Sequence, residues 1–368
     1  MNKFMISHRQ AIILFLICTI SSKMQMLPCL MAGTAGKDFW IVLLFGAVID
    51  ISLLFITIII NKLCPNTTIH DLLRNTFGKV VSTIIVVLFF IYFICTAVLP
   101  FEAVRDVFAS NLFDTIPWQI FAIFLLLCVG YLSFSGLRTL GRTAELYFYV
   151  VAGAVVFLIF LGVLNTDFSQ ILPLSTINLS QTTTYFMHSI WFGDYMIFFV
   201  LIGRINPNDG TLKFKDIFFF AGAIVIYAVA YVTLWGLYTI TTPTQASLLS
   251  SISAFSLLSL EIGRLDWFLV LLSQIASVIS CSTYVYCAAE CVYQLNSKRK
   301  FGGCVIATLI ILYLADIILF KNLDKGILFF TKYLSLPSFI LQVLIPLTCL
   351  ISAIIIAARK KRLRRKLC

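Results

Sequence analysis

The chain has 368 residues, of which 61% are hydrophobic and 12% are charged, and its formal net charge is +11. A soluble domain is about 45–50% apolar and about 25% charged, so this composition excludes a soluble globular protein, a disordered chain and a secreted disulfide scaffold. The apolar residues form long blocks without period-two alternation, which argues against an outer-membrane β-barrel. An all-α, polytopic membrane protein remains, because each helical span needs roughly 20 residues.

Ten apolar segments predict ten transmembrane helices, at about 10–33, 39–63, 79–101, 118–135, 143–165, 183–203, 215–240, 265–294, 303–320 and 335–358. The first segment has no small-residue cleavage pattern, so we expect it to be retained as a helix. Two longer connections lie at 102–117 and 241–264. The second is rich in Ser and Leu and favours either an amphipathic helix on the membrane surface or a structured loop.

The positive charge indicates membrane orientation, and no nucleic-acid partner is expected. With ten spans and an inside N-terminus, 20 of the 27 Lys and Arg residues fall in inside segments, six fall in outside segments and Lys23 lies within a span. This bias follows the positive-inside rule, so both termini are expected in the cytoplasm. We expect one integral-membrane domain over residues 1–367 and a basic cytoplasmic tail over 359–368 that contacts the lipid bilayer.

Polar residues interrupt two spans near the bilayer centre, where charged groups are costly and tend to mark function. The first span carries Lys23 near its midpoint, followed by Pro28, and the sixth carries Gly193 and Asp194. These spans occupy matching places in two five-helix halves, predicted as inverted repeats over about 10–165 and 183–358. Such paired interruptions point to a transporter-type binding site. Two interpretations stay open: a neutralised Lys23–Asp194 pair that holds the helices together, or a site for a ligand or a proton.

Other polar positions add to this picture. Tyr92 and Thr96 lie four residues apart in the third span, and hydroxyl residues 273, 277 and 280 share one face of the eighth. Small hydroxyl residues at this spacing serve helix packing or line a polar cavity. Glu145, near Arg138 and Arg142, and Glu290, near 298–300, are predicted to form interfacial ion pairs, and Asp50 is predicted to face a neighbouring helix.

The sequence has no recognisable nucleotide-binding, hydrolase or zinc motif, so we expect no enzymatic activity, no cofactor and no metal site. The absence of C-x-x-C and the presence of only three histidines support the last expectation. The candidate ligand-binding residues are Ser21, Ser22, Lys23, Met24, Tyr92, Thr96, Phe192, Gly193, Asp194, Ser277 and Ser280.

The sequence resembles the B-subunit (GerAB-like) family of bacterial spore nutrient-germinant receptors, a branch of the amino acid/polyamine/organocation transporter superfamily. The resemblance runs nearly end to end and rests on short motifs in a fixed order: ISHRQ at 6–10, AGKDFW at 35–40, DTIPW at 114–118, SGLRTLGRTAE at 135–145, ILP at 171–173, FGD at 192–194 and GRLD at 263–266. Each motif is weak alone, but their order and spacing are specific.

The resemblance implies a LeuT-like 5+5 inverted repeat of ten helices, with broken first and sixth helices. It also implies a spore inner-membrane location, A-type and C-type partner subunits, and a role in sensing a small, amino acid-like nutrient to trigger germination. Superfamily members bind substrate among the first, third, sixth and eighth helices, which implies that role for the candidate residues. The chain departs from the family at Ser21–Met24, where a glycine-containing break is usual, and at Asp194, which is often Glu.

Three functions therefore remain in view. The chain is a germinant sensor, a proton-coupled secondary transporter of amino acids or amines, or a membrane platform subunit that binds no ligand. The sensor is the preferred prediction.

Overall fold

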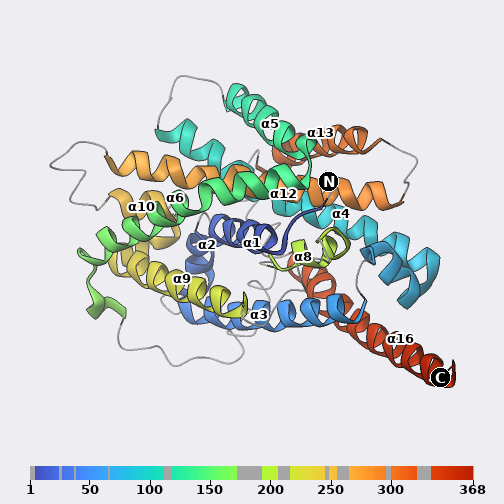
Figure 1. Ribbon diagram of the computed structural model, residues 1–368. Coiled ribbons are helices and arrows are strands. Elements are labelled where there is room, and N and C mark those ends of the chain that lie inside the picture. Colours follow the sequence, from blue (N-terminus) through green and yellow to red (C-terminus); the bar gives the residue numbers. More distant parts are fainter. Residues whose placement is uncertain are drawn as a thin grey trace.

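The computed structural model describes residues 5–24, 27–36, 39–64, 67–111, 118–171, 193–205, 216–244, 248–254, 265–295, 300–320 and 333–367. These residues are almost entirely helical, and the β pairing among them is one bridge between Ile6 and Ile205. The predicted all-α class is therefore confirmed. Figure 1 shows the helices packed along and across one another in a bundle, with the C-terminal helix projecting from one end.

The N-terminal half contains α1 (His8–Lys23), α2 (Leu27–Ala35), α3 (Phe39–Leu63), α4 (Ile69–Asn111), α5 (Trp118–Ser135) and α6 (Leu137–Val163), followed by a short 3-10 helix at Phe168–Ile171. Helices α3 and α5 coincide with the second and fourth predicted spans. The first predicted span divides into α1 and α2. Pro28 lies in the first turn of α2, where its missing N–H removes no hydrogen bond from the helix.

The predicted bounds of the third span and of the loop after it were wrong, because helix α4 extends beyond the span at both ends. The helix continues through residue 111, so residues 102–111 are helical. It also begins ten residues earlier than predicted, at Ile69, and turns at Gly78, whose φ of 82° is a left-handed value that glycine adopts readily. The Thr68 hydroxyl caps its start by accepting the Asp71 N–H at 3.2 Å.

The C-terminal half contains α8 (Met196–Val200), a 3-10 turn (Ile202–Arg204), α9 (Asp216–Tyr238), η6 (Thr239–Thr244), α10 (Leu248–Ala254), α12 (Leu265–Leu295), α13 (Phe301–Phe320), α15 (Ser335–Phe339), a π-helical turn (Ile340–Leu344) and α16 (Ile345–Leu367). Most of the sixth predicted span lies outside the described residues. Its described part is residues 193–203, where the chain turns at Asp194 and enters α8.

Five described helical stretches are long and apolar enough to cross a membrane: Ile69–Arg105, Leu137–Val163, Val270–Leu295, Phe301–Leu319 and Leu336–Ile356. Three shorter apolar helices accompany them, at His8–Ser21, Gln119–Ser135 and Gly222–Tyr238. The count of ten membrane spans, the inverted repeats and the extent of the domain and tail stay predictions.

Helix α12 is the centre of the bundle, since it packs against α1, α4, α5, α6 and α13 (Figure 1). Its residues 279–291 are almost fully buried. Small side chains such as Ala276, Ser277 and Ser280 allow the neighbouring helices to approach closely. Helix α1 lies between α12 and α6 on one side and α9 on the other, which places its C-terminal end inside the protein.

The connection 241–264 is partly described, and its helix α10 is a structured segment rather than a helix on the membrane surface. Leu248, Leu249 and Ile252 are buried, and α10 packs against α6, α9 and α12. An amphipathic surface helix would expose its polar face, whereas Ser251 and Ser253 are buried as well.

Candidate functional site

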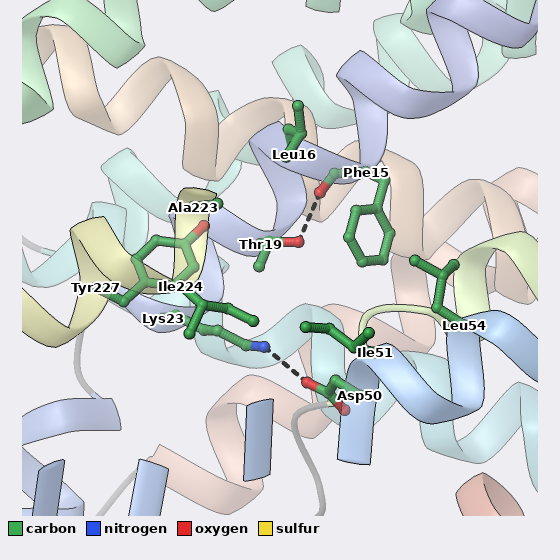
Figure 2. Close-up of a pocket in the computed structure, with 10 residues that line it drawn as sticks. All are labelled: Phe15, Leu16, Thr19, Lys23, Asp50, Ile51, Leu54, Ala223, Ile224 and Tyr227. Carbon is green, nitrogen blue, oxygen red and sulfur yellow. Dashed lines mark hydrogen bonds and ion pairs between the residues drawn. The ribbon is translucent and has the colours of Figure 1, made fainter. Parts of the chain in front are cut away.

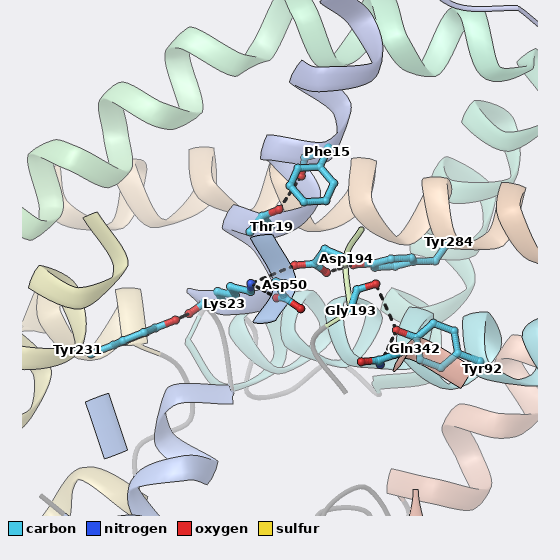
Figure 3. Close-up of polar contacts among 10 residues, drawn as sticks. All are labelled: Phe15, Thr19, Lys23, Asp50, Tyr92, Gly193, Asp194, Tyr231, Tyr284 and Gln342. Atoms are coloured by element: carbon cyan, nitrogen blue, oxygen red, sulfur yellow. Dashed lines mark hydrogen bonds and ion pairs between the residues drawn. The ribbon is translucent and has the colours of Figure 1, made fainter. Parts of the chain in front are cut away.

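The end of α1 carries a buried lysine between two carboxylates. The Lys23 Nζ lies 2.7 Å from Oδ2 of Asp50 on α3 and 3.9 Å from Oδ2 of Asp194. Lys23 and Asp194 are 7% and 3% exposed, and buried charges are retained only where partners compensate for lost hydration. Figure 3 shows the three side chains converging from α1, α3 and the segment before α8. Lys23 therefore contacts Asp194 in the second interrupted segment directly and has a closer partner, Asp50, on α3.

Asp194 has a second partner on α12. The Tyr284 hydroxyl donates to Asp194 Oδ1 at 2.8 Å, and both side chains are buried (Figure 3). A hydrogen bond to a charged acceptor is worth about 1.5–3 kcal/mol. The two oxygens of Asp194 thus face different helices, with α1 on one side and α12 on the other.

The main chain at the end of α1 is also held by a side chain. The Tyr231 hydroxyl of α9 donates to the Lys23 carbonyl oxygen at 2.9 Å, which satisfies one of the carbonyls left without a partner at the end of a helix. The next residue, Met24, is completely buried and has left the helical conformation, with φ −109° and ψ 5°. Helix α1 therefore ends inside the bundle, with its terminus fixed by α9.

A second polar cluster holds Gly193. The Gln342 Nε2 donates to the Tyr92 hydroxyl at 3.0 Å, and that hydroxyl donates to the Gly193 carbonyl at 3.5 Å (Figure 3). The Tyr195 hydroxyl donates to the Gln342 carbonyl. Gln342 lies in the π-helical turn, where the altered hydrogen-bond register is a feature often found at functional sites.

We expect Gly193→Ala to destabilise this cluster. A Cβ at position 193 would lie 2.6 Å from Cδ and 2.9 Å from Oε1 of Gln342, which is buried and bonded to Tyr92. Displacing Gln342 should lower the free energy of unfolding by about 1–3 kcal/mol. Chemical unfolding of the purified protein measures the change. The matched control is Gly153→Ala, where a Cβ meets nothing within 4 Å, and equal stability of the two variants would contradict the expectation.

A small cavity lies beside the Lys23–Asp50 pair. Its volume is ≈ 20 Å³, and its lining includes Lys23, Asp50, Thr19 and Tyr227 (Figure 2). About 10–15 Å³ of such space is needed to hold one water molecule. This cavity therefore has room for a water next to the ion pair but not for a nutrient molecule.

The structure places the predicted residues in two groups. Lys23, Met24, Tyr92, Gly193 and Asp194 surround the polar centre. The others form hydrogen bonds between or within helices. Ser21 donates to Ser277 at 3.2 Å and joins α1 to α12. Within their own helices, Ser280 donates to the Ala276 carbonyl at 2.8 Å and Thr96 donates to the Tyr92 carbonyl at 2.9 Å. Phe192 and the side chain of Ser22 lie outside what the structure describes.

Sequence reasoning did not include four residues that complete the site: Asp50, Tyr231, Tyr284 and Gln342. Asp50 carried a signal, since it is an acid inside an otherwise apolar segment, and it was predicted only to face a neighbouring helix. Tyr284 continues the face of hydroxyl residues on α12. Tyr231 and Gln342 had no signal of their own, because tyrosine and glutamine are tolerated at many places in a bundle.

Two further ion pairs have partners other than those predicted. Glu290 accepts from Arg204 Nε at 3.0 Å, and of the basic run at 298–300 the structure describes only residue 300. Glu145 accepts from Gln10 Nε2 at 3.0 Å and lies 3.4 Å from Arg9. Both acids were expected to form ion pairs and do so, but α1 and the 3-10 turn supply the cations. Within the described residues, no group of three His, Cys, Asp or Glu side chains is placed to hold a metal ion.

Solved transporter structures share this architecture. MHP1, a nucleobase-cation-symport-1 family transporter in a closed conformation with bromovinylhydantoin bound, superposes with a TM-score of 0.59 at 11% identity, covering 100% of this chain and 96% of that one. A manganese transporter from Eremococcus coleocola gives a TM-score of 0.53 at 11% identity, covering 91% of this chain and 76% of the other. This chain therefore has the fold of membrane transporters. Its own polar centre lies at the end of α1.

The sequence family described as "Spore germination protein" matches residues 5–324, and the chain belongs to this family. Spore germination protein KB of Bacillus subtilis (strain 168) is 23% identical over 380 residues, covering 100% of this chain and 98% of the relative. Spore germination protein A2 of the same organism is 23% identical over 272 residues, covering 72% of each. The resemblance to the germinant-receptor B-subunit family is thereby confirmed, as is the expectation of a membrane protein that is not an enzyme.

Proposed function

We propose that this chain is the membrane subunit of a spore germinant receptor and binds a small, amino acid-like nutrient at the end of α1. One observation carries the proposal: buried Lys23 and Asp194 and half-buried Asp50 lie together where α1 stops inside the bundle. Burying ionisable groups is costly, and such groups inside a membrane protein are rare and usually functional. Packing alone would be served equally well by apolar residues.

The contacts of Lys23 suggest how a nutrient would bind. The ammonium is 2.7 Å from Asp50 but 3.9 Å from Asp194, so the Asp194 contact is the weaker of the two. A ligand ammonium group can compete with Lys23 for Asp194, and a ligand carboxylate can take the place of Asp194 at Lys23. A zwitterionic nutrient fits both exchanges, and binding it requires more space than the ≈ 20 Å³ cavity beside Lys23 provides.

Ligand binding would then act as a signal. The ≈ 20 Å³ cavity cannot hold a nutrient, so the ligand must bind a conformation in which α1 or residues 193–195 have moved. A ligand shifts such an equilibrium only by binding one conformation better. We propose that A-type and C-type receptor subunits sense this shift at the spore inner membrane, with both termini of this chain in the cytoplasm. The names of the two relatives support a role in spore germination.

Secondary transport is the second candidate function, favoured by the likeness to the symporter fold. Lys23 between two acids is chemically suited to proton coupling. Saturable uptake of an amino acid or amine into liposomes containing only this chain, dependent on a proton gradient, would support transport. Absence of uptake with retained binding would favour the sensor. A platform subunit would show neither.

A ligand screen tests the proposal. The twenty L-amino acids are added singly to the purified chain, and the free energy of unfolding is measured for the wild type and for Lys23→Ala/Asp50→Asn, which removes the pair without leaving Asp50 unpartnered. At a concentration 100 times Kd, a ligand should stabilise the wild type by about 2.7 kcal/mol and the variant by far less. Stabilisation of neither protein, or equal stabilisation of both, would contradict nutrient binding at this site.

A further inference from the structure

A second buried group of charges, the α4–α13 network, joins the end of α4 to α13. The Arg105 guanidinium on α4 pairs with Glu102 one turn earlier, and its Nη1 lies 2.8 Å from Oδ2 of Asp316 on α13. Asp316 is 0% exposed and Glu102 is 5% exposed. Tyr92 of the polar centre lies ten residues before Glu102, about 15 Å along the axis of α4. The network is therefore distinct from the candidate nutrient site.

One carboxylate oxygen of the network faces no hydrogen-bond donor. Asp316 Oδ2 accepts from Arg105, whereas Asp316 Oδ1 is buried and has no donor among the described residues. The Asp316 carboxyl also lies within hydrogen-bonding reach of the Glu102 carboxyl. Ionised carboxyl groups only accept hydrogen bonds, so two of them cannot bond with each other unless one carries a proton. A proton held between Glu102 and Asp316 would supply the missing donor.

The charges around the two acids favour the same assignment. Two carboxyl groups share one guanidinium, and like charges that share a buried site disfavour each other's ionisation. Helices α5, α12 and α13, which pack around this part of α4, contain no Lys, Arg or His, and the described residues 333–358 contain no charged side chain. The titratable group of α12 that faces Asp316 is the Cys281 thiol, which adds no positive charge. One bound proton would leave Glu102, Arg105 and Asp316 neutral as a group.

We propose that Glu102 and Asp316 share one bound proton at neutral pH, which makes the α4–α13 network a proton-binding site that fastens α13 to α4. The proton exchanges with water at the edge of the network, where the Arg105 side chain is 13% exposed. When the proton leaves, the bond between the two carboxyl groups is lost and a net negative charge stays buried, which is costly. Raising the pH therefore weakens the contact between α4 and α13.

Infrared spectroscopy of the purified chain, in a detergent without carbonyl groups, tests the shared proton. At neutral pH the wild type should show the C=O band of a protonated carboxyl group. Glu102→Gln and Asp316→Asn should each remove the same part of this band, because the remaining acid then pairs one-to-one with Arg105. The control Glu290→Gln should keep the whole band, since Glu290 already pairs with Arg204. If neither variant or only one of them removes part of the band, the two acids do not share a proton.

Chemical unfolding at several pH values is an independent test. A proton that the native chain holds and the unfolded chain releases makes the stability fall as the pH rises. Glutamine at position 102 has the shape of protonated glutamate and can donate to Asp316, so Glu102→Gln should fold and lack this dependence. Near neutral pH, the unfolding equilibrium constant of the wild type should rise about tenfold per pH unit relative to the variant, as expected for one proton. Parallel pH profiles, or a Glu102→Gln chain that does not fold, would overturn the proposal.

Discussion

Lys23→Met is expected to lower the free energy of unfolding by about 3–5 kcal/mol, the usual cost of breaking a buried ion pair from one side. Methionine keeps most of the length of the lysine side chain but removes the ammonium that lies 2.7 Å from Asp50 and 3.9 Å from Asp194. Buried Asp194 and half-buried Asp50 would then lack the cation that lies between them. Unfolding of the purified protein by a denaturing detergent measures the loss.

The double variant Lys23→Met/Asp50→Asn is the control for this expectation. Removing both charges of the tighter pair should recover most of the lost stability, because a neutral pair carries no uncompensated charge. Recovery of less than about 1 kcal/mol would show that the ammonium contributes through packing rather than through Asp50. A double-mutant cycle with Asp50→Asn alone then gives the coupling energy of the pair.

Asp194→Asn is expected to weaken nutrient binding roughly 10–100-fold, which corresponds to the loss of one charge-assisted contact. Asparagine has the shape of aspartate, and its Oδ1 can still accept the Tyr284 hydroxyl, which lies 2.8 Å away in the wild type. The fold should therefore be retained while the charge is lost. Equilibrium binding of whichever amino acid stabilises the wild type measures the effect.

Glu290→Gln is the matched control for Asp194→Asn. It also removes a buried carboxylate charge on the bundle, here the partner of Arg204, but it leaves the polar centre unchanged. Its binding affinity should stay within about threefold of the wild type. Similar losses in both variants would mean that binding depends on general stability and not on a contact with Asp194.

The sequence was sufficient to predict much of the fold because lipid imposes a simple rule. Apolar stretches of membrane-spanning length give helices, and α3 and α5 begin and end where hydropathy places them. Hydropathy was not sufficient to predict where α4 ends. Its last turns before Asn111 contain charged residues that pair within the protein, as Arg105 does with Asp316 at 2.8 Å. Sequence patterns show that a residue is charged but not which neighbour satisfies it.

The candidate site illustrates the same limit. Lys23 and Asp194 were predictable because a charge in the middle of an apolar span has few explanations other than function. Their shared partner Asp50 was not placed, because its position depends on how α3 is rotated against α1. The same holds for Glu290, whose partner Arg204 is 86 residues away in the chain. Pairings across a bundle follow from packing, which one sequence does not reveal.

The most direct measurement is a germination dose response in spores that carry the wild-type chain, Asp194→Asn or Glu290→Gln, with equal protein levels verified by immunoblot. If a nutrient binds at Asp194, the concentration for half-maximal germination should rise at least tenfold in Asp194→Asn and stay within about threefold in Glu290→Gln, as expected from one lost charge-assisted contact. An unchanged dose response in Asp194→Asn would contradict nutrient sensing at the end of α1.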